Sequence, residues 1–348
     1  MKTFFTLIAS FVLLSSSLTL GAQDLHNTLF YMNPLHMNPA FSGAYEGTYR
    51  IGGIYRDQAR SVVTNAYSTP TLFIDAPVVM LGKRHWLGVG GLMFRDQAGD
   101  GKLQMNSFQL SGALHLAMDK KSQNIMTIGV QWGQVQRQIK DRDAFILGDF
   151  LEEKQNNVLN PKTNDPFITQ NSGQDDLKKN FTDVNAGILF TRKGKDGNGF
   201  NAGFSVRHIT RPSSVNFEPG GPKQALRLIG HAQLTTNLDD KWSVTPELYY
   251  TNMDKATQFQ VHGWAGYKLN PEKRIQLNFG LGYRSNDAGQ LLLGMDYGDI
   301  KAAIAYDVTL SQLNEANNYK GGFELSVYYI GKIYKKPEVK PVILCPHL

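Results

Sequence analysis

Histidine, cysteine and acidic side chains are the residues of this sequence that could do nucleophilic, acid–base or metal-binding chemistry. The chain has eight histidines and one cysteine, and they form neither a paired-cysteine zinc spacing nor a His-Glu-x-x-His motif. Asp96 and Asp100 stand near glycines, as in a calcium loop, but Lys102 and an incomplete ligand set argue against one. A Gly-x-Ser-x-Gly elbow and a Walker loop are also absent. We therefore predict no catalytic, cofactor-binding or metal-binding residue, and we interpret the protein as non-enzymatic.

The elements that would position any site are short runs in which apolar and polar residues alternate. In the last run Phe323, Leu325 and Val327 share one face, and Glu324 and Ser326 share the other. Because side chains of a strand point to opposite faces with a period of two, each run predicts a strand with one apolar and one mixed face. Fourteen such runs follow one another, at 48–56, 70–79, 86–95, 104–117, 124–137, 182–192, 199–208, 225–236, 242–251, 258–269, 275–284, 289–297, 299–309 and 321–332.

The number of runs and the lengths of their connections predict a transmembrane barrel. Single-chain bacterial outer-membrane barrels have an even number of antiparallel strands, short periplasmic turns and longer extracellular loops. Here every second connection is short, which assigns the short connections to one end of the barrel. The three longest connections, at 57–69, 138–181 and 209–224, all lie at the opposite end. The predicted fold class is therefore all-β, a transmembrane antiparallel β-barrel of about 14 strands. The alternative is a large soluble β-sandwich or propeller, which would bury the same apolar faces in a core.

The N-terminal residues and the overall charge bear on where the protein works. Residues 1–22 read as a secretory signal peptide, with Lys2 before a short apolar core and cleavage after Ala22 or Gly21. The rest of the chain has no apolar run long enough for a spanning helix. The net charge is only +6 and no Arg/Lys-rich tract with interleaved aromatics occurs, which argues against nucleic-acid binding. We predict export to the bacterial outer membrane, with both termini periplasmic.

The segment before the first strand, residues 23–47, is predicted to be a leader with a separate role. It carries two Asn-Pro pairs, Asn33-Pro34 and Asn38-Pro39, and proline resists regular strand pairing. We expect it to plug the lumen of the barrel (48–332) or to line its periplasmic mouth; the alternative is a leader simply tethered to the wall. Asn38, Pro39 and Phe41 are candidate partner-binding residues.

The C-terminal residues 333–348 form a basic, proline-containing tail after the last strand. A tail of this kind is predicted to dock onto a periplasmic partner, and the alternative is a solvated terminus. Cys345 has no second cysteine to pair with, so it would cross-link to a partner or, as we favour, sit buried in a partner's groove. With Cys345, the candidate partner-binding residues of the tail are Pro346 and Leu348.

Several short motifs follow one another along the chain. They are Asn33-Pro34, Asn38-Pro39-Ala40-Phe41-Ser42-Gly43, Tyr55-Arg56-Asp57-Gln58, Gly88-Val89-Gly90-Gly91, Asp96-Gln97-Ala98-Gly99, Phe204-Ser205-Val206-Arg207-His208, Gly282-Tyr283-Arg284, Tyr306-Asp307 and Cys345-Pro346-His347-Leu348. Their order resembles the PorP/SprF family of type IX secretion system membrane proteins of Bacteroidota. The resemblance covers essentially the whole mature chain, although a Trp often found in the family is replaced by Ala59 and its usual ending by His347-Leu348.

The resemblance implies an outer-membrane component or accessory of type IX secretion without cofactors. Its partners would be outer-membrane lipid and either periplasmic secretion-ring lipoproteins or a large secreted surface adhesin, the latter often linked to gliding motility. The alternative is a porin-like or substrate-specific transport channel, since Arg207, Asp307 and Glu324 fall at inward positions that suit a wet lumen.

Overall fold

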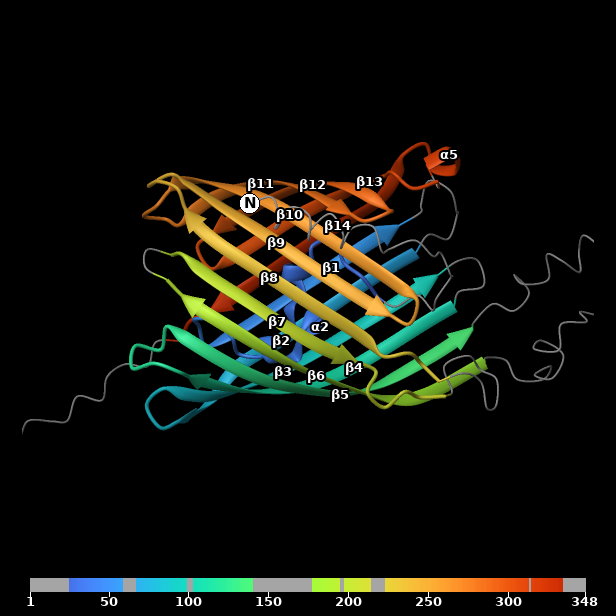
Figure 1. Cartoon of the computed structure of the whole chain (residues 1–348), viewed down its shortest axis with the longest axis horizontal. Helices are drawn as coiled ribbons and strands as arrows, with labels where there is room; N and C mark the ends of the chain where they lie inside the picture. The colour runs from blue at the N-terminus through green and yellow to red at the C-terminus, as the bar shows by residue number, and fades with distance from the viewer. Residues whose placement is uncertain are drawn as a thin grey trace, which may run out of the picture.

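The computed structural model of the chain describes residues 25–58, 67–98, 103–139, 177–194, 197–213, 223–312 and 314–333. These residues form one closed antiparallel barrel of fourteen strands, in which each strand pairs with the next and the last pairs with the first (Figure 1). The strands are β1 (Tyr49–Gln58), β2 (Tyr67–Leu81), β3 (His85–Ala98), β4 (Leu103–Ala117), β5 (Asn124–Ile139), β6 (Leu177–Lys193), β7 (Gly199–Arg207), β8 (Arg227–Asn237), β9 (Trp242–Met253), β10 (Ala256–Asn270), β11 (Ile275–Arg284), β12 (Ala288–Tyr297), β13 (Ile300–Thr309) and β14 (Lys320–Gly331).

The barrel closes where β1 meets β14, with Tyr49 opposite Gly331 and Asp57 opposite Phe323. Closure leaves no free strand edge, so every strand has a partner on both sides. The predicted all-β transmembrane barrel of fourteen strands is confirmed, and the sandwich and propeller alternatives are wrong. Each predicted run lies on one observed strand. The main differences are β2 and β6, which are longer than expected: β2 extends at both of its ends and β6 mainly at its loop end.

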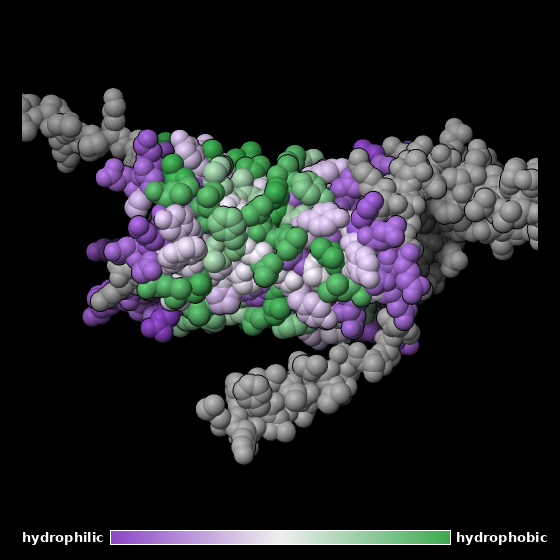
Figure 2. Space-filling model, turned by 90° about the horizontal axis from the view of Figure 1, so that it is seen from above, coloured by the Kyte–Doolittle hydropathy of each residue, from purple (hydrophilic) through white to green (hydrophobic). Residues whose placement is uncertain are grey.

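The burial pattern is that of a barrel whose outside is apolar and whose inside is polar. On β14, Phe323 and Leu325 are 41% and 47% exposed, whereas Glu324 and Ser326 between them are each 1% exposed. A water-soluble protein would show the reverse. Figure 2 shows the consequence: apolar side chains form a band around the middle of the barrel, between hydrophilic ends. This band is the surface that contacts the hydrocarbon of the membrane.

Exposed aromatic side chains border the apolar band at both ends. Rings of this kind sit at the membrane–water interface, where an apolar body meets a polar edge. At the end that carries the long connections they are Tyr55, Phe108, Trp132, Tyr250, Phe259, Tyr283 and Phe323, and at the opposite end they are Phe200, Trp242, Tyr297 and Tyr329.

The two ends of the barrel differ in their connections, as the sequence predicted. At one end, the turn end, the links are tight: β12 and β13 are joined through Gly298, whose φ of +62° suits a two-residue hairpin turn. At the other end, the loop end, lie the three longest connections, those after β5, β7 and β13. One of the loop-end connections carries a short helix, α5 (Asn314–Asn317). Within the described residues, no helix is long and apolar enough to cross a membrane.

Candidate functional site: the leader inside the barrel

The leader folds into three short helical turns that lie inside the barrel. They are η1 (Phe30–Met32), α2 (Pro34–Met37) and η2 (Pro39–Phe41), drawn in blue within the wall in Figure 1. Each of the last two begins with the proline of an Asn-Pro pair, because proline fits the first helical position, where no backbone donor is needed. The Asn38 side chain also accepts a hydrogen bond from the backbone N–H of Ala40 at 2.9 Å, which caps η2.

Apolar side chains of the leader and of the wall form a hydrophobic core inside the lumen. Leu35 and Ala40 are 0% exposed, Met37 is 2% exposed, and Phe30 stacks on the His262 imidazole with 4.7 Å between ring centroids. The residues of this cluster are Leu25, Phe30, Leu35, Met37, Ala40, Phe41, Phe73, Leu92, Phe94, Leu189, Ile229 and Tyr249. The described part of the leader therefore lies within the lumen, packed against the wall.

A buried cluster of charges holds the first described turn of the leader. The backbone N–H of Thr28 donates to Glu324 Oε1 at 2.6 Å, and its hydroxyl donates to Asp307 Oδ1 at 2.8 Å. Arg56 pairs with both carboxylates, and Arg284 pairs with Asp307. Two guanidinium groups and two carboxylates therefore balance one another around Thr28, which is the condition for keeping such charges out of water.

Two further arginines of the wall bind carbonyl groups of the leader. Arg207, at the end of β7, donates to the backbone carbonyl of His36 at 2.6 Å. Arg227, at the start of β8, donates to the carbonyl of Leu25 at 2.6 Å. Several other carbonyls of the leader accept from its own backbone N–H groups. For those of Leu25 and His36 the wall supplies the donors that burial demands.

A bidentate ion pair fixes the end of the leader next to β1. Arg50 binds both oxygens of Asp75 at 2.9 Å, and Asp75 also accepts from the backbone N–H of Gly43 at 2.7 Å. The Tyr45 hydroxyl donates to the Asp75 carbonyl, and burial together with the Asp75 charge raises the pKa of Tyr45 above its ordinary value. The phenol therefore stays protonated and remains a donor.

The second Asn-Pro turn lies directly against the wall. The Asn38 amide donates to the carbonyl of Ile188 at 2.9 Å and lies 3.1 Å from His231 Nε2. A Cβ atom on Gly129 of β5 would come within 2.5 Å of the Pro39 carbonyl carbon. Glycine at this inward position lets the backbone of the leader approach the sheet closely.

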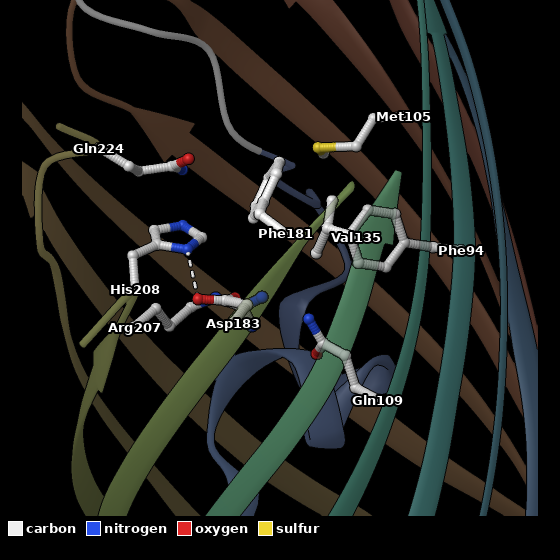
Figure 3. A pocket seen from close by; sticks show the side chains of 9 residues that line it. All are labelled: Phe94, Met105, Gln109, Val135, Phe181, Asp183, Arg207, His208 and Gln224. Carbon is white, nitrogen blue, oxygen red and sulfur yellow. Dashed lines mark hydrogen bonds and ion pairs between the residues drawn. The ribbon is translucent and has the colours of Figure 1, made fainter. Parts of the chain in front are cut away.

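Above the leader, at the loop end of the lumen, lies a small pocket lined by both apolar and polar side chains (Figure 3). Its volume is about 10 Å³, room for about one water molecule. His208 Nδ1 lies 3.0 Å from Asp183 Oδ1, and Arg207 links the pocket to the leader through the His36 carbonyl. The lining residues, Phe94, Met105, Gln109, Val135, Phe181, Asp183, Arg207, His208 and Gln224, include no serine, threonine or cysteine. Nowhere in the described ranges do three His, Cys, Asp or Glu residues gather closely enough to hold a metal ion.

The structure brings together only some of the candidate partner-binding residues. Asn38, Pro39 and Phe41 meet in the lumen, where they are buried and their contacts are with the barrel wall. That they bind a separate partner stays a prediction. Cys345, Pro346 and Leu348, like the predicted signal peptide and most of the tail, lie outside the described residues.

One expectation about the lumen changes. Under the channel alternative Arg207, Asp307 and Glu324 were to line a wet lumen, but each is at most 2% exposed and bonds to the leader. Leu25, the first described residue of the leader, lies among loop-end residues such as Arg227. The periplasmic position of the two termini stays a prediction. Charged residues at inward positions of alternating runs were the available signal for this interface. What they would bind was not visible in the sequence.

Comparison with known proteins identifies the family. Residues 19–329 match the family described as type IX secretion system membrane protein PorP/SprF. The chain belongs to this family. The predicted membership is thereby confirmed, and this PorP/SprF protein is an outer-membrane β-barrel component of the type IX secretion system. No curated protein matches the chain.

Among solved structures the PorP/SprF chain is similar to other barrels at low identity. It is 11% identical to the CymD monoaromatic hydrocarbon channel, covering 87% of this chain and 93% of that chain with a TM-score of 0.48. It is 11% identical to the P. putida toluene transporter TodX, covering 86% and 93% with a TM-score of 0.45. It is 11% identical to the translocator domain of the autotransporter NalP from Neisseria meningitidis, covering 86% and 94% with a TM-score of 0.40.

Proposed function

We propose that this PorP/SprF protein is a sealed, non-enzymatic scaffold that supports export and surface anchoring of a large secreted adhesin, as used in gliding motility. The observation that carries the proposal is the packed lumen. An open pore needs a continuous polar channel, and here the leader occupies the interior with Leu35 and Ala40 fully buried. A barrel filled in this way is suited to hold partners at its two ends rather than to conduct solutes.

The asymmetry of the two ends supports a division of partners between them. In outer-membrane barrels the short turns face the periplasm and the longer loops face outward. On that orientation the turn end and the C-terminal tail after Gly331 lie beside a periplasmic secretion ring. The loop end, with the connections after β1, β5 and β7, faces the adhesin.

Deletion of the gene tests the anchoring role directly. We expect the adhesin to accumulate inside the cell or to be shed into the medium, and gliding to stop, while outer-membrane integrity measured by detergent sensitivity stays normal. Restoring the wild-type gene is the control. If surface display and gliding are unchanged by the deletion, the anchoring proposal is wrong.

Co-purification from mild detergent separates the two branches of the family. Recovery of a large secreted repeat protein favours a dedicated adhesin partner, whereas recovery of periplasmic lipoproteins favours a core subunit that ties the barrel to the secretion ring. Steady current through the purified protein in a planar bilayer would overturn the sealed scaffold and favour the channel alternative.

A further inference from the structure

One side of the barrel wall continues beyond the apolar band at the loop end. On β5 the outward side chains are apolar as far as Trp132 and are glutamines from Gln134 onward, yet the strand continues to Ile139. On the far side β11 ends at Arg284, directly after the exposed aromatic Tyr283. In Figure 1 β4, β5 and β6 accordingly reach farther at the loop end than β7 and β8.

The outward face of this extension is a ladder of amide side chains. Gln134 donates to the Thr182 hydroxyl at 2.9 Å, and Gln136 donates to Asn180 Oδ1 at 3.1 Å. Pairs across neighbouring strands hold each side chain in place. The amides therefore present fixed donors and acceptors just outside the hydrocarbon, at the level of lipid headgroups.

A groove crosses the border between this ladder and the apolar band. Its volume is about 690 Å³. Its lower part, on the side of the apolar band, is lined by Leu72, Met93 and Phe108, which are 58%, 52% and 51% exposed. Its upper part is lined by Arg95 and Gln136, together with further amides of the ladder. We name it the interfacial groove.

The two halves of the interfacial groove define the chemistry of its occupant. The lower half suits acyl chains, and the aromatic ring of Phe108 offers a face to a sugar or a chain. Amides above it suit hydroxyl-rich groups, which both donate and accept hydrogen bonds. The Arg95 guanidinium suits a phosphate, which it can bind with two parallel hydrogen bonds.

We propose that the interfacial groove binds a phosphorylated glycolipid of the outer leaflet, with its phosphate at Arg95 and its sugars on the amide ladder. The position of the groove, half in the apolar band and half above it, matches a molecule that spans the same border. The proposal goes beyond the scaffold function and shares with it only the assignment of the loop end to the cell surface. A bound glycolipid would fix the height and rotation of the barrel for partners docking beside it.

Native mass spectrometry of the purified full chain in nanodiscs tests this proposal. The probes are purified lipopolysaccharide and the same lipopolysaccharide after phosphatase treatment, each in a phosphatidylethanolamine background. We expect the wild type to retain the phosphorylated form. Arg95→Gln should weaken retention about tenfold, because a charge-assisted hydrogen bond is lost, and phosphatase treatment should have the same effect.

Matched variants at positions that do not line the interfacial groove are the controls. Lys320→Gln removes an exposed loop-end cation from β14, and Phe279→Ala removes a side chain 48% exposed, close to the 51% of Phe108. Phe108→Ala should weaken retention and neither control should. Gel mobility before and after boiling verifies that all variants fold.

Equal retention by Arg95→Gln and Lys320→Gln, or equal retention of both lipopolysaccharide forms, would overturn the proposal. So would retention of phosphatidylethanolamine alone, or of a tightly bound protein in the groove. These measurements use purified protein and do not depend on export, so the glycolipid site and the anchoring function can fail independently.

Discussion

The close contact between Gly129 and the leader allows the plug to be loosened by one methyl group. In Gly129→Ala the new Cβ would lie 2.5 Å from the Pro39 carbonyl carbon and 2.6 Å from Ala40 Cα. Ordinary contacts between carbon atoms are about 3.5–4.0 Å, so the η2 turn must move by about 1 Å. A displacement of that size breaks the hydrogen bonds of Asn38 to the Ile188 carbonyl, now 2.9 Å, and of Ser42 to Ser111, now 2.7 Å.

The free energy that the docked leader loses decides how often the lumen should open. Overpacking costs about 1–3 kcal/mol and each lost hydrogen bond about 1 kcal/mol, so the docked leader loses about 3–5 kcal/mol. Burial of Leu35, Met37 and Phe41 contributes about 1.5–3 kcal/mol for each side chain, which exceeds that loss. The leader should therefore stay docked most of the time and leave the lumen roughly a hundredfold to a few thousandfold more often.

Planar-bilayer recordings measure this difference. We expect brief, infrequent openings in the wild type and a much higher opening frequency in Gly129→Ala. Gly263→Ala is the matched control, because a Cβ there meets nothing within 4 Å. An opening frequency in Gly129→Ala equal to that of Gly263→Ala would refute the claim that the leader seals the lumen.

Three further outcomes follow from the buried charges, a turn and the path of the leader. Arg56→Ala leaves two buried carboxylates with one guanidinium and should lower the free energy of unfolding by about 3–5 kcal/mol in urea titrations followed by gel mobility, and adding Glu324→Gln should restore part of it. Hydrogen bonds from Arg274 and Lys332 hold the pKa of Asp299 below its usual range. The contribution of the Asp299 carboxylate to stability is therefore present at neutral pH and lost as the pH falls through that lowered pKa. The thermal midpoint of Asp299→Asn should lie below that of wild type at pH 7 and equal it in acid. The third outcome concerns a chain that carries His26→Cys, Cys345→Ser and Gly129→Ala. The cysteine at position 26 should react with a membrane-impermeant maleimide added outside intact cells, because Gly129→Ala loosens the leader. Labelling only from the periplasm would contradict the path of the leader.

The links at the turn end and the pocket at the loop end of the lumen differ in how directly the sequence indicates them. Tight links such as Gly298-Asp299 carry local turn chemistry, so their position was predictable. The pocket joins Gln109 of β4, Asp183 of β6 and Gln224 of a loop, which lie far apart in the chain. Their meeting depends on the closure and register of the whole sheet, and short-range patterns do not encode it.

The sequence by itself determined the fold class and the location of the protein. Alternation with a period of two is a local property of a strand, so runs such as the one around Phe323 and Glu324 predict their own faces. The even number of runs and the unequal connections then predicted a membrane barrel with two different ends. The Asn-Pro leader was recognisable as a segment outside the wall, because two closely spaced Asn-Pro pairs resist regular strand pairing and no alternating run accompanies them.

Only the tertiary structure decided what the leader does and what the inward charges mean. The sequence pattern around Glu324 and Asp307 is the same whether these side chains face water or a buried Thr28, so the pattern does not distinguish the two environments. The choice depends on closure of the barrel, which brings β1, β13 and β14 around the first turn of the leader. Side-chain pairing across such distances in sequence is set by packing in three dimensions, which here places the leader inside the lumen.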